Sequence, residues 1–275
     1  MKQVLLICVN YNSYKELIQY LNSIEKALIN NTFKRAVNLT VYVVDNSILK
    51  QEINFTSPDF NLKIIQCKEN KGYLGAAALV FNSIDFDIKV KLDYMMITNV
   101  DILLEEDFFI NLFNFKCDDS IGWIAPKIWS VGEKRDRNPR LLSRPKLSLI
   151  KKNLFLTKHP LLMLLWRKTI SVINKRLTKR DNISSNKRFI YAGHGSCFIF
   201  TNSFIKYYPT IEYPSFLFGE EVFFGELCIK KNLNVLYYPL LKVIDFDHVS
   251  TQKISNKNYC EYLYKSSLMM KKLLS

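Results

Sequence analysis

The sequence predicts an α/β fold in which a mostly parallel sheet is flanked by helices, with one basic helical insert. Three observations support this prediction. In the first part of the 275-residue chain, short apolar runs alternate with segments of helical periodicity, as they do in parallel sheets wrapped by helices. Polar residues follow the apolar runs, and the net charge of +14 is concentrated in one segment.

The apolar runs and the periodic segments place the individual elements. Strands are expected at 4–9, 39–44, 62–66 and 94–98. A helix is expected at 13–28, where Leu and Ile recur at helical spacing and Ser13 is placed to cap. Another is expected at 74–83, after the turn at 70–72. After the basic insert, the sequence again has the apolar character of a globular core at 197–201. A helix is then expected at 220–232, a strand-like run at 235–238 and a helical stretch at 256–274.

Polar clusters follow three of the expected strands, at 10–12, 45–47 and 99–101. Ligands of open α/β sheets bind at the carboxyl ends of the strands, so these clusters are expected to face one crevice. Asn and Asp also end strands and form turns, which explains any single cluster without a ligand. Three in succession favour the crevice.

The positive charge lies between residues 133 and 190, where 17 Lys or Arg accompany only three acids. The rest of the chain has 22 residues of each sign and is neutral. Because the basic residues alternate with Leu, Phe and Trp166, residues 134–188 are expected to contact an anionic membrane surface. A solvated helical hairpin covering the core is the plain alternative, and binding to nucleic acid is the less favoured one.

The six cysteines stand far apart without a C-x-x-C pair, which is typical of buried thiols in a reducing compartment. The N-terminal apolar run is too short for a signal sequence. No apolar run reaches the roughly 18 residues that span a bilayer. The expected location is therefore cytoplasmic, with peripheral attachment to the inner face of the cell membrane.

The clearest chemical signal is a buried strand that stops at Asp101. A carboxylate fixed at a strand end can hold Mg²⁺ or Mn²⁺ and leave positions for water and a diphosphate. Taken alone, an Asn-x-Asp sequence most often marks a turn.

Two further features carry ionisable groups. Glu220 and Glu221 begin a helix that follows an aromatic loop. Acids at this position either interact favourably with the helix dipole or include a general base. Residue His248 ends the strand-like run that begins at Val243. A lone histidine is more often structural than a ligand, although this one can complete a metal or diphosphate site with Asp101.

The order of these motifs resembles family 2 glycosyltransferases with the GT-A fold. The motifs are V-N-Y-N-S, V-V-D-N-S, N-K-G-Y-L-G-A, T-N-V-D, G-E-E and H-V-S, and the resemblance covers residues 3–130 and 189–255. Among that family the chain is most similar to rhamnosyltransferase-like members that build surface polysaccharides. The basic insert lies outside the resemblance.

The resemblance implies roles for individual residues. It places Asn10, Tyr11, Asp45, Gly72, Tyr73 and Asn99 around the nucleotide sugar. It makes Asp101 and His248 the metal ligands and Glu221 the catalytic base, with Glu220 beside it, and the choice between the two glutamates stays open. Asn99 stands where the family often has its first metal-binding acid, and Phe223 where many members have another acid.

The implied activity is inverting transfer of a sugar from a nucleoside diphosphate, UDP or dTDP, to a hydroxyl of a glycan or lipid-linked acceptor. The expected division is a nucleotide-sugar half at 1–132, the insert at 133–188, an acceptor-binding half at 189–255 and a C-terminal helix at 256–275. A non-catalytic sugar-nucleotide or glycan-binding module of the same fold is the alternative. Donor sugar, linkage and oligomeric state are not predicted.

Overall fold

A computed structural model describes residues 1–29, 37–158, 186–247 and 255–275. Its strands are β1 (Lys2–Asn10), β2 (Val37–Asp45), β3 (Asn61–Gln66), β4 (Tyr94–Asn99), β5 (Ile102–Leu104), β6 (Ile121–Ser130), β7 (Arg135–Asp136), β8 (Arg188–Ile190), β9 (Cys197–Thr201) and β10 (Asn234–Asp245). Its helices are α1 (Tyr14–Ile29), α2 (Tyr73–Ser83), α3 (Phe86–Lys89), α4 (Phe108–Asn114), α5 (Leu147–Thr157), α7 (Asn202–Tyr207), α8 (Glu220–Lys230) and α9 (Asn256–Leu274).

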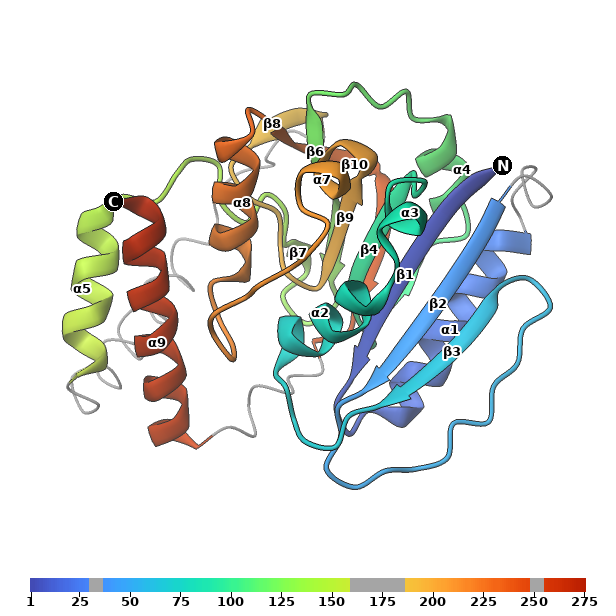
Figure 1. The fold of residues 1–275 in the computed structure, drawn as a ribbon, viewed down its shortest axis with the longest axis horizontal. Coiled ribbons are helices and arrows are strands. Elements are labelled where there is room, and N and C mark those ends of the chain that lie inside the picture. The colour runs from blue at the N-terminus through green and yellow to red at the C-terminus, as the bar shows by residue number, and fades with distance from the viewer. Residues whose placement is uncertain (30–36, 159–185, 248–254) are drawn as a thin grey trace.

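The described strands form one sheet in the order β3-β2-β1-β4-β9-β6-β10-β5, with β7 paired to β6 and β8 to β10 (Figure 1). The first four strands are parallel. Their register sets Asn10 opposite Asp45 and Val9 opposite Asn99. The polar clusters that follow these strands therefore lie at one edge of the sheet, as the sequence predicts for a parallel sheet.

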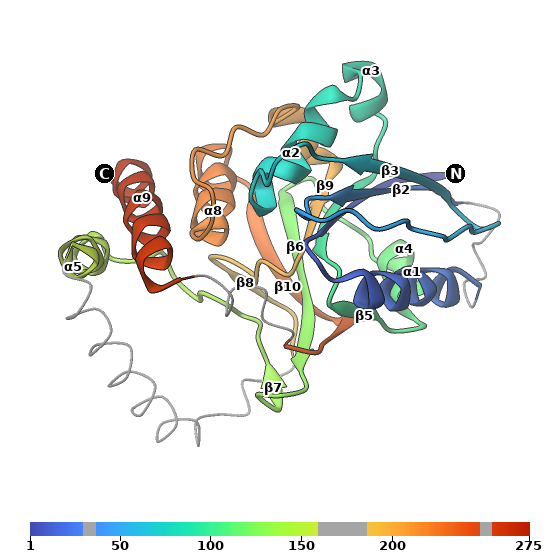
Figure 2. The ribbon, with the colours of Figure 1, turned by 90° about the horizontal axis from the view of Figure 1, so that it is seen from below.

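Helices cover both faces of the sheet and bury two apolar clusters (Figure 2). On one face, Leu17 and Leu21 of α1 pack with Phe108 of α4. On the other, α2 and α8 bury side chains such as Leu74 and Phe224. The predicted α/β class, with a mostly parallel sheet between helices, is confirmed.

The central strand β6 is missing from the sequence prediction. Its residues are buried almost throughout, because it lies between β9 and β10 with helices on both faces. A strand buried on both faces lacks polar alternation, and Pro126 inside it argues against a strand. Trp123 of this strand packs against Phe198 of the neighbouring strand β9, with ring centroids 5.2 Å apart.

The expected elements coincide with observed ones to within two residues at each end, except in β10. The helix expected at 220–232 ends at Lys230. The run at 235–238 and the one beginning at Val243 form the single strand β10, whose register shifts between Tyr238 and Lys242. In the basic segment, α5 lies within the described residues, whereas 159–185 lie outside them.

A bidentate ion pair anchors the start of the basic segment to the core. Both terminal oxygens of the buried Glu226 accept hydrogen bonds from Arg144 at 2.8 Å, and Tyr191 donates a third at 2.8 Å. The α5 helix continues from this anchor and packs beside α9 (Figure 1). No described helix has the length and apolar character needed to cross a membrane.

Candidate active site

A cleft of about 610 Å³ opens where β1 and β4 end. Its other walls come from the loop before α8, the β6–β7 hairpin, the loop at 194–196 and the start of α9, which supplies Ser255, Asn258 and Tyr262. The backbone N–H of Asn99 donates to the carbonyl of Ser196 at 3.0 Å. The end of β4 is thereby joined to the loop at 194–196.

Seven of the ten residues singled out from the sequence line this cleft. They are Tyr11, Gly72, Tyr73, Asn99, Asp101, Glu220 and Glu221. Segments more than 200 residues apart in the chain thus share one cavity. His248 lies outside the described residues, so its predicted position is not tested.

Asn10 and Asp45 lie beneath the cleft and do not line it. Both are fully buried, and the Asn10 amide donates to the Asp45 carboxylate at 3.2 Å. The Tyr14 hydroxyl donates to the other carboxylate oxygen at 2.9 Å. In this structure the pair ties the ends of β1 and β2 together, whereas the resemblance implies that both residues contact the nucleotide.

The turn at 70–72 is held by a neighbour of Asp45. Asn46 donates to the side-chain oxygen of Asn70 at 2.7 Å and to the carbonyl of Gly72 at 3.1 Å, and accepts from the N–H of Lys71 at 2.9 Å. Gly72 has a φ of +73°, and a Cβ there would overlap the carbonyl oxygen of Phe216. Glycine is therefore required for this close approach.

The Tyr73 hydroxyl is buried and has no hydrogen-bond partner among the described residues. Burial, together with the nearby charges of Cys197 and Glu220, raises the pKa of this phenol well above its ordinary value. Unpaired buried polar groups are costly, and Tyr73 is one of the residues that line the cleft.

The two adjacent glutamates have different environments. Helix α8 begins after Gly219, whose φ is +93°. Glu220 is buried and accepts a hydrogen bond from the N–H of Phe218 at 2.9 Å. Burial and the charge of Glu221 raise the pKa of Glu220. The side chain of Glu221 is 19% exposed, and one of its oxygens lies 3.7 Å from Nε of Arg140. Of the pair, Glu221 is the more accessible carboxylate.

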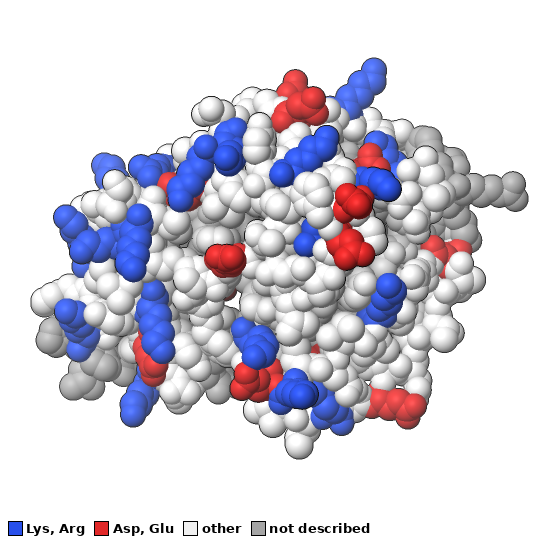
Figure 3. Space-filling model, viewed as in Figure 1, with Lys and Arg blue, Asp and Glu red and all other residues white. Residues whose placement is uncertain are grey.

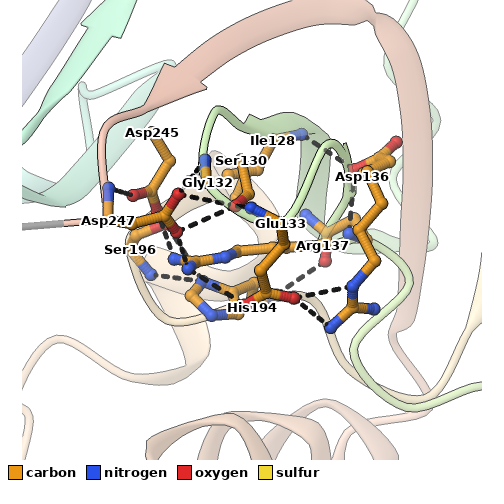
Figure 4. Close-up of polar contacts among 12 residues, drawn as sticks. Ile128, Ser130, Gly132, Glu133, Asp136, Arg137, His194, Ser196, Asp245 and Asp247 are labelled. Atoms are coloured by element: carbon orange, nitrogen blue, oxygen red, sulfur yellow. Dashed lines mark hydrogen bonds and ion pairs between the residues drawn. The ribbon is translucent and has the colours of Figure 1, made fainter. Parts of the chain in front are cut away.

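A cluster of acids around Arg137 closes one end of the cleft (Figure 4). Arg137 donates to Asp245 at 2.7 Å and forms an ion pair with Asp247. Asp247 also accepts from the hydroxyl of Ser130 at 2.7 Å. The backbone N–H of Phe246 points to the carbonyl oxygen of Asp101 at 3.3 Å, which joins this cluster to the end of β4.

The pKa values of the two acids beside Arg137 shift in opposite directions. Burial raises the pKa of Asp245, and the opposing charge of Arg137 does not cancel the effect. For Asp247, burial also acts upward, but hydrogen bonds from Ser130 and Gly132 outweigh it and the pKa is lowered. Sequence analysis missed Arg137 because it counted this residue with the basic insert. Nothing in the sequence separates Arg137, which follows β7, from the other basic residues between 133 and 190.

The ring of His194 is held in one orientation beside this cluster (Figure 4). Its Nδ1 accepts a hydrogen bond from the N–H of Ser196 at 3.2 Å, which leaves the proton of the neutral ring on Nε2. Burial lowers the pKa of His194 to about 3, and the charges of Arg140 and Arg137 add to this effect. At neutral pH the residue is an uncharged hydrogen-bond donor at the cleft wall.

No group of three His, Cys, Asp or Glu suited to a metal ion is present in the described parts of the chain. The oxygen atoms of Asp101 and Asn99 are of the type that Mg²⁺ and Mn²⁺ prefer. Such ions keep several positions for water and phosphate oxygens, so two protein ligands in the cleft are compatible with one of them.

The chain has the GT-A fold of glycosyltransferases. GalNAc-T7, solved with UDP, GalNAc and Mn²⁺, is similar with a TM-score of 0.56 and 12% identity over 95% of this chain. TarS of S. aureus, residues 1–349, is similar with a TM-score of 0.57 and 12% identity over 98% of this chain and 71% of that one. A longer TarS structure gives a TM-score of 0.54 and 15% identity, over 98% of this chain and 43% of that one.

These likenesses establish the fold and no finer class. This chain spans 48% of the GalNAc-T7 chain, about half its length. No protein-family model matches the sequence, and neither does any curated protein.

We expect Gly72→Ala to destabilise the protein, because a backbone with φ 73° and ψ 179° costs a residue with a Cβ about 1–3 kcal/mol and the added carbon overlaps Phe216. The matched control is Gly75→Ala in the same helix, where the nearest atom would be 3.6 Å away. That change should stabilise the helix by up to about 1 kcal/mol. Urea unfolding measures both, and equal effects would refute the proposed constraint at Gly72.

We expect Glu220→Gln to reduce the loss of stability as pH rises. The pKa of Glu220 is raised in the folded state, so its contribution is fully present below about pH 4.3, the unfolded value, and is lost as pH rises through the folded pKa. Free energies of unfolding should be measured from about pH 5 to about pH 8. The exposed Glu212 provides the control: Glu212→Gln should follow the wild type, and a Glu220→Gln curve parallel to it would contradict the expectation.

Proposed function

We propose that this protein is an inverting glycosyltransferase that moves a sugar from a nucleoside diphosphate to a hydroxyl of a glycan or lipid-linked acceptor. One observation carries the proposal: in a GT-A fold, Asp101 and Glu221 line the same cleft. A candidate metal-binding acid and a candidate base must share a pocket for a single displacement to occur.

Glu221 is the proposed general base. It is the more exposed of the two glutamates, and a base must reach the acceptor hydroxyl from which it takes the proton. Gly195 faces it, since a Cβ on that residue would lie 3.5 Å from a Glu221 oxygen. The missing side chain leaves room for an acceptor group beside the carboxylate. Glu220, buried and bonded to Phe218, positions the loop before α8.

Tyr11, Gly72, Tyr73 and Asn99 are proposed to contact the donor. Gly72 allows the backbone to approach it closely, and the unpaired hydroxyl of Tyr73 would find a hydrogen-bond partner there. Asn10 and Asp45 would support this wall from below through their mutual bond. UDP or dTDP is the proposed nucleotide.

Asp101 and His248 are proposed to hold Mg²⁺ or Mn²⁺, with Asn99 at the end of β4 on the donor side. When bound, such an ion neutralises the charge that develops on a departing nucleoside diphosphate. The protein would fix the Asp101 carboxylate after the end of β4, in the same cleft in which Glu221 accepts the proton. Attack from the side opposite the leaving group would invert the anomeric configuration.

An anionic membrane surface is the proposed partner through residues 134–188, on the inner face of the cell membrane. In the described part of this segment, α5 exposes Lys151, Lys152 and Phe155. Lysine and arginine side chains gather over the α5 and α9 end of the molecule (Figure 3). Such a mixture of basic and apolar groups suits anionic lipid. Surface polysaccharide synthesis of the rhamnosyltransferase type is the proposed setting.

We expect Glu221→Gln to retain donor binding and to lose transfer by about 10²–10⁴-fold, the usual contribution of a general base. Binding is measured as the rise in melting temperature with UDP- or dTDP-sugars, and transfer as release of the nucleoside diphosphate with acceptor present. Glu212→Gln, outside the cleft, should behave as wild type. Full turnover in Glu221→Gln would remove this residue from the reaction. Donor binding without transfer in the wild type would favour the non-catalytic binding module.

We expect Asp101→Ala to lose activity together with its dependence on added Mg²⁺ or Mn²⁺, because the carboxylate supplies a ligand that water does not replace equally. Donor-induced melting shifts with and without Mn²⁺ provide a second measurement. Asp107→Ala, a change in a 45% exposed side chain on the following segment, is the control. Wild-type activity that survives EDTA unchanged would contradict the proposed role of the metal.

A further inference from the structure

Arg140 presents a guanidinium at the cleft beside the candidate base. Its Nε lies 3.7 Å from an oxygen of Glu221, which is too far for a hydrogen bond. The side chain is 54% exposed and lines the cleft. A cation therefore stands next to the carboxylate that we assign to proton transfer, with its donors open to an incoming molecule.

The charge of Arg140 is the least compensated among the four arginines between residues 135 and 144. Each of the others has a carboxylate oxygen within 2.8 Å: Arg135, Arg137 and Arg144. Within the described parts of the chain, the Arg140 guanidinium makes no comparable contact. Arginine presents up to five N–H donors, so most of its hydrogen-bonding capacity is available.

The backbone that carries Arg140 is held firmly on both sides. The Asn138 side chain donates to the carbonyl of Pro126 at 2.7 Å and accepts from the N–H of His194 at 2.7 Å. Leu141 donates to the carbonyl of Ala192 at 3.0 Å. These bonds tie the segment to β6 and to the loop that faces Glu221, so the backbone from which the Arg140 side chain extends is fixed at the cleft wall.

We propose that the acceptor carries an anionic group, a carboxylate or a phosphate, next to the hydroxyl that receives the sugar, and that Arg140 binds this group. The proposal rests on the proposed transferase function and names its acceptor class. A planar guanidinium binds carboxylate and phosphate oxygens through two parallel bonds. An acceptor anchored in this way would place its neighbouring hydroxyl at Glu221.

The donor diphosphate is the other possible source of such an anion. The position of Arg140 favours the acceptor, because its nearest carboxylate is Glu221. Arg137 is the guanidinium that lies with Asp245, next to the strand end that carries Asp101. The two arginines therefore serve different ends of the cleft.

The test measures binding of matched probes to the full chain by NMR titration. One pair is methyl β-D-glucuronide and methyl β-D-glucoside, and the other is glycerol 3-phosphate and glycerol. UDP is titrated separately as the donor-side probe. The variants are Arg140→Gln, Arg140→Lys and the control Arg135→Gln, whose side chain is 55% exposed on the same wall but pairs with Glu133.

We expect the anionic member of at least one pair to bind the wild type about tenfold tighter than its neutral partner, as a charge-assisted bond allows. Arg140→Gln should abolish this preference, Arg140→Lys should restore part of it, and Arg135→Gln should keep it. UDP binding should be unchanged in Arg140→Gln.

Three outcomes would overturn the proposal. The first is that the wild type binds the anionic and neutral probes equally. The second is that Arg135→Gln loses the preference for the anionic probe as fully as Arg140→Gln does. The third is that Arg140→Gln weakens UDP binding but leaves binding of the anionic probes unchanged, which would assign Arg140 to the donor. Failure of both UDP and dTDP, titrated in the same way, to bind the wild type would instead count against the proposed transferase, because that arm does not involve Arg140.

Discussion

The ion pairs of Arg137 with Asp245 and Asp247 are the contact on which the cleft most depends. They hold the end of β10 against the β6–β7 hairpin, and the N–H of Phe246 then fixes the carbonyl of Asp101. Bringing these charges out of water is costly, and partners with additional hydrogen bonds are needed to offset that cost. Ser130 and Gly132 supply those bonds to Asp247. The geometry of the proposed metal end is thus set by a charge cluster outside the motifs.

The cleft has more carboxylates than cations. Six acids line it, Asp101, Glu133, Glu220, Glu221, Asp245 and Asp247, against three arginines, Arg135, Arg137 and Arg140. A nucleoside diphosphate is itself anionic and would be repelled by such a surface unless positive charge accompanied it. This imbalance supports the proposed divalent ion at Asp101. In a cleft with so few cations, an arginine without a close carboxylate partner matters for binding. Near Glu221, Arg140 is the cation that is still able to bind an anion.

The sequence pattern was sufficient for the parallel half of the sheet, whereas the expectation that Glu221 shares a site with Asp101 came from the resemblance to family 2 glycosyltransferases. Strand ends in a parallel sheet meet at one edge, so the polar clusters could be placed by topology alone. Burial could not be predicted in the same way. Asp45 carries the residue type of a ligand-binding acid, yet its partners Asn10 and Tyr14 come from other segments. Sequence spacing contains no information about those contacts.

The arginines of the cleft could not be recognised from the sequence for a related reason. Net charge assigned them to one basic segment, but the fold divides that segment between two environments. Arg137 and Arg140 face the cleft, while Lys151 and Lys152 of α5 face solvent. The strand β6 escaped prediction because it is buried on both sides, so its sequence has no polar face to display its period.

The contribution of α9 to the cleft has a consequence for biosynthesis. Asn258 and Tyr262 form part of its wall, and the ring of Tyr262 packs on Phe216 with centroids 4.8 Å apart. Domains begin to fold while the ribosome is still extending the chain. The β1 and β4 side of the cleft can form early, but its opposite wall must wait until residues near 262 have left the exit tunnel. A nascent chain halted before that point would hold an unfinished pocket, and its aromatic loop would be exposed to chaperones.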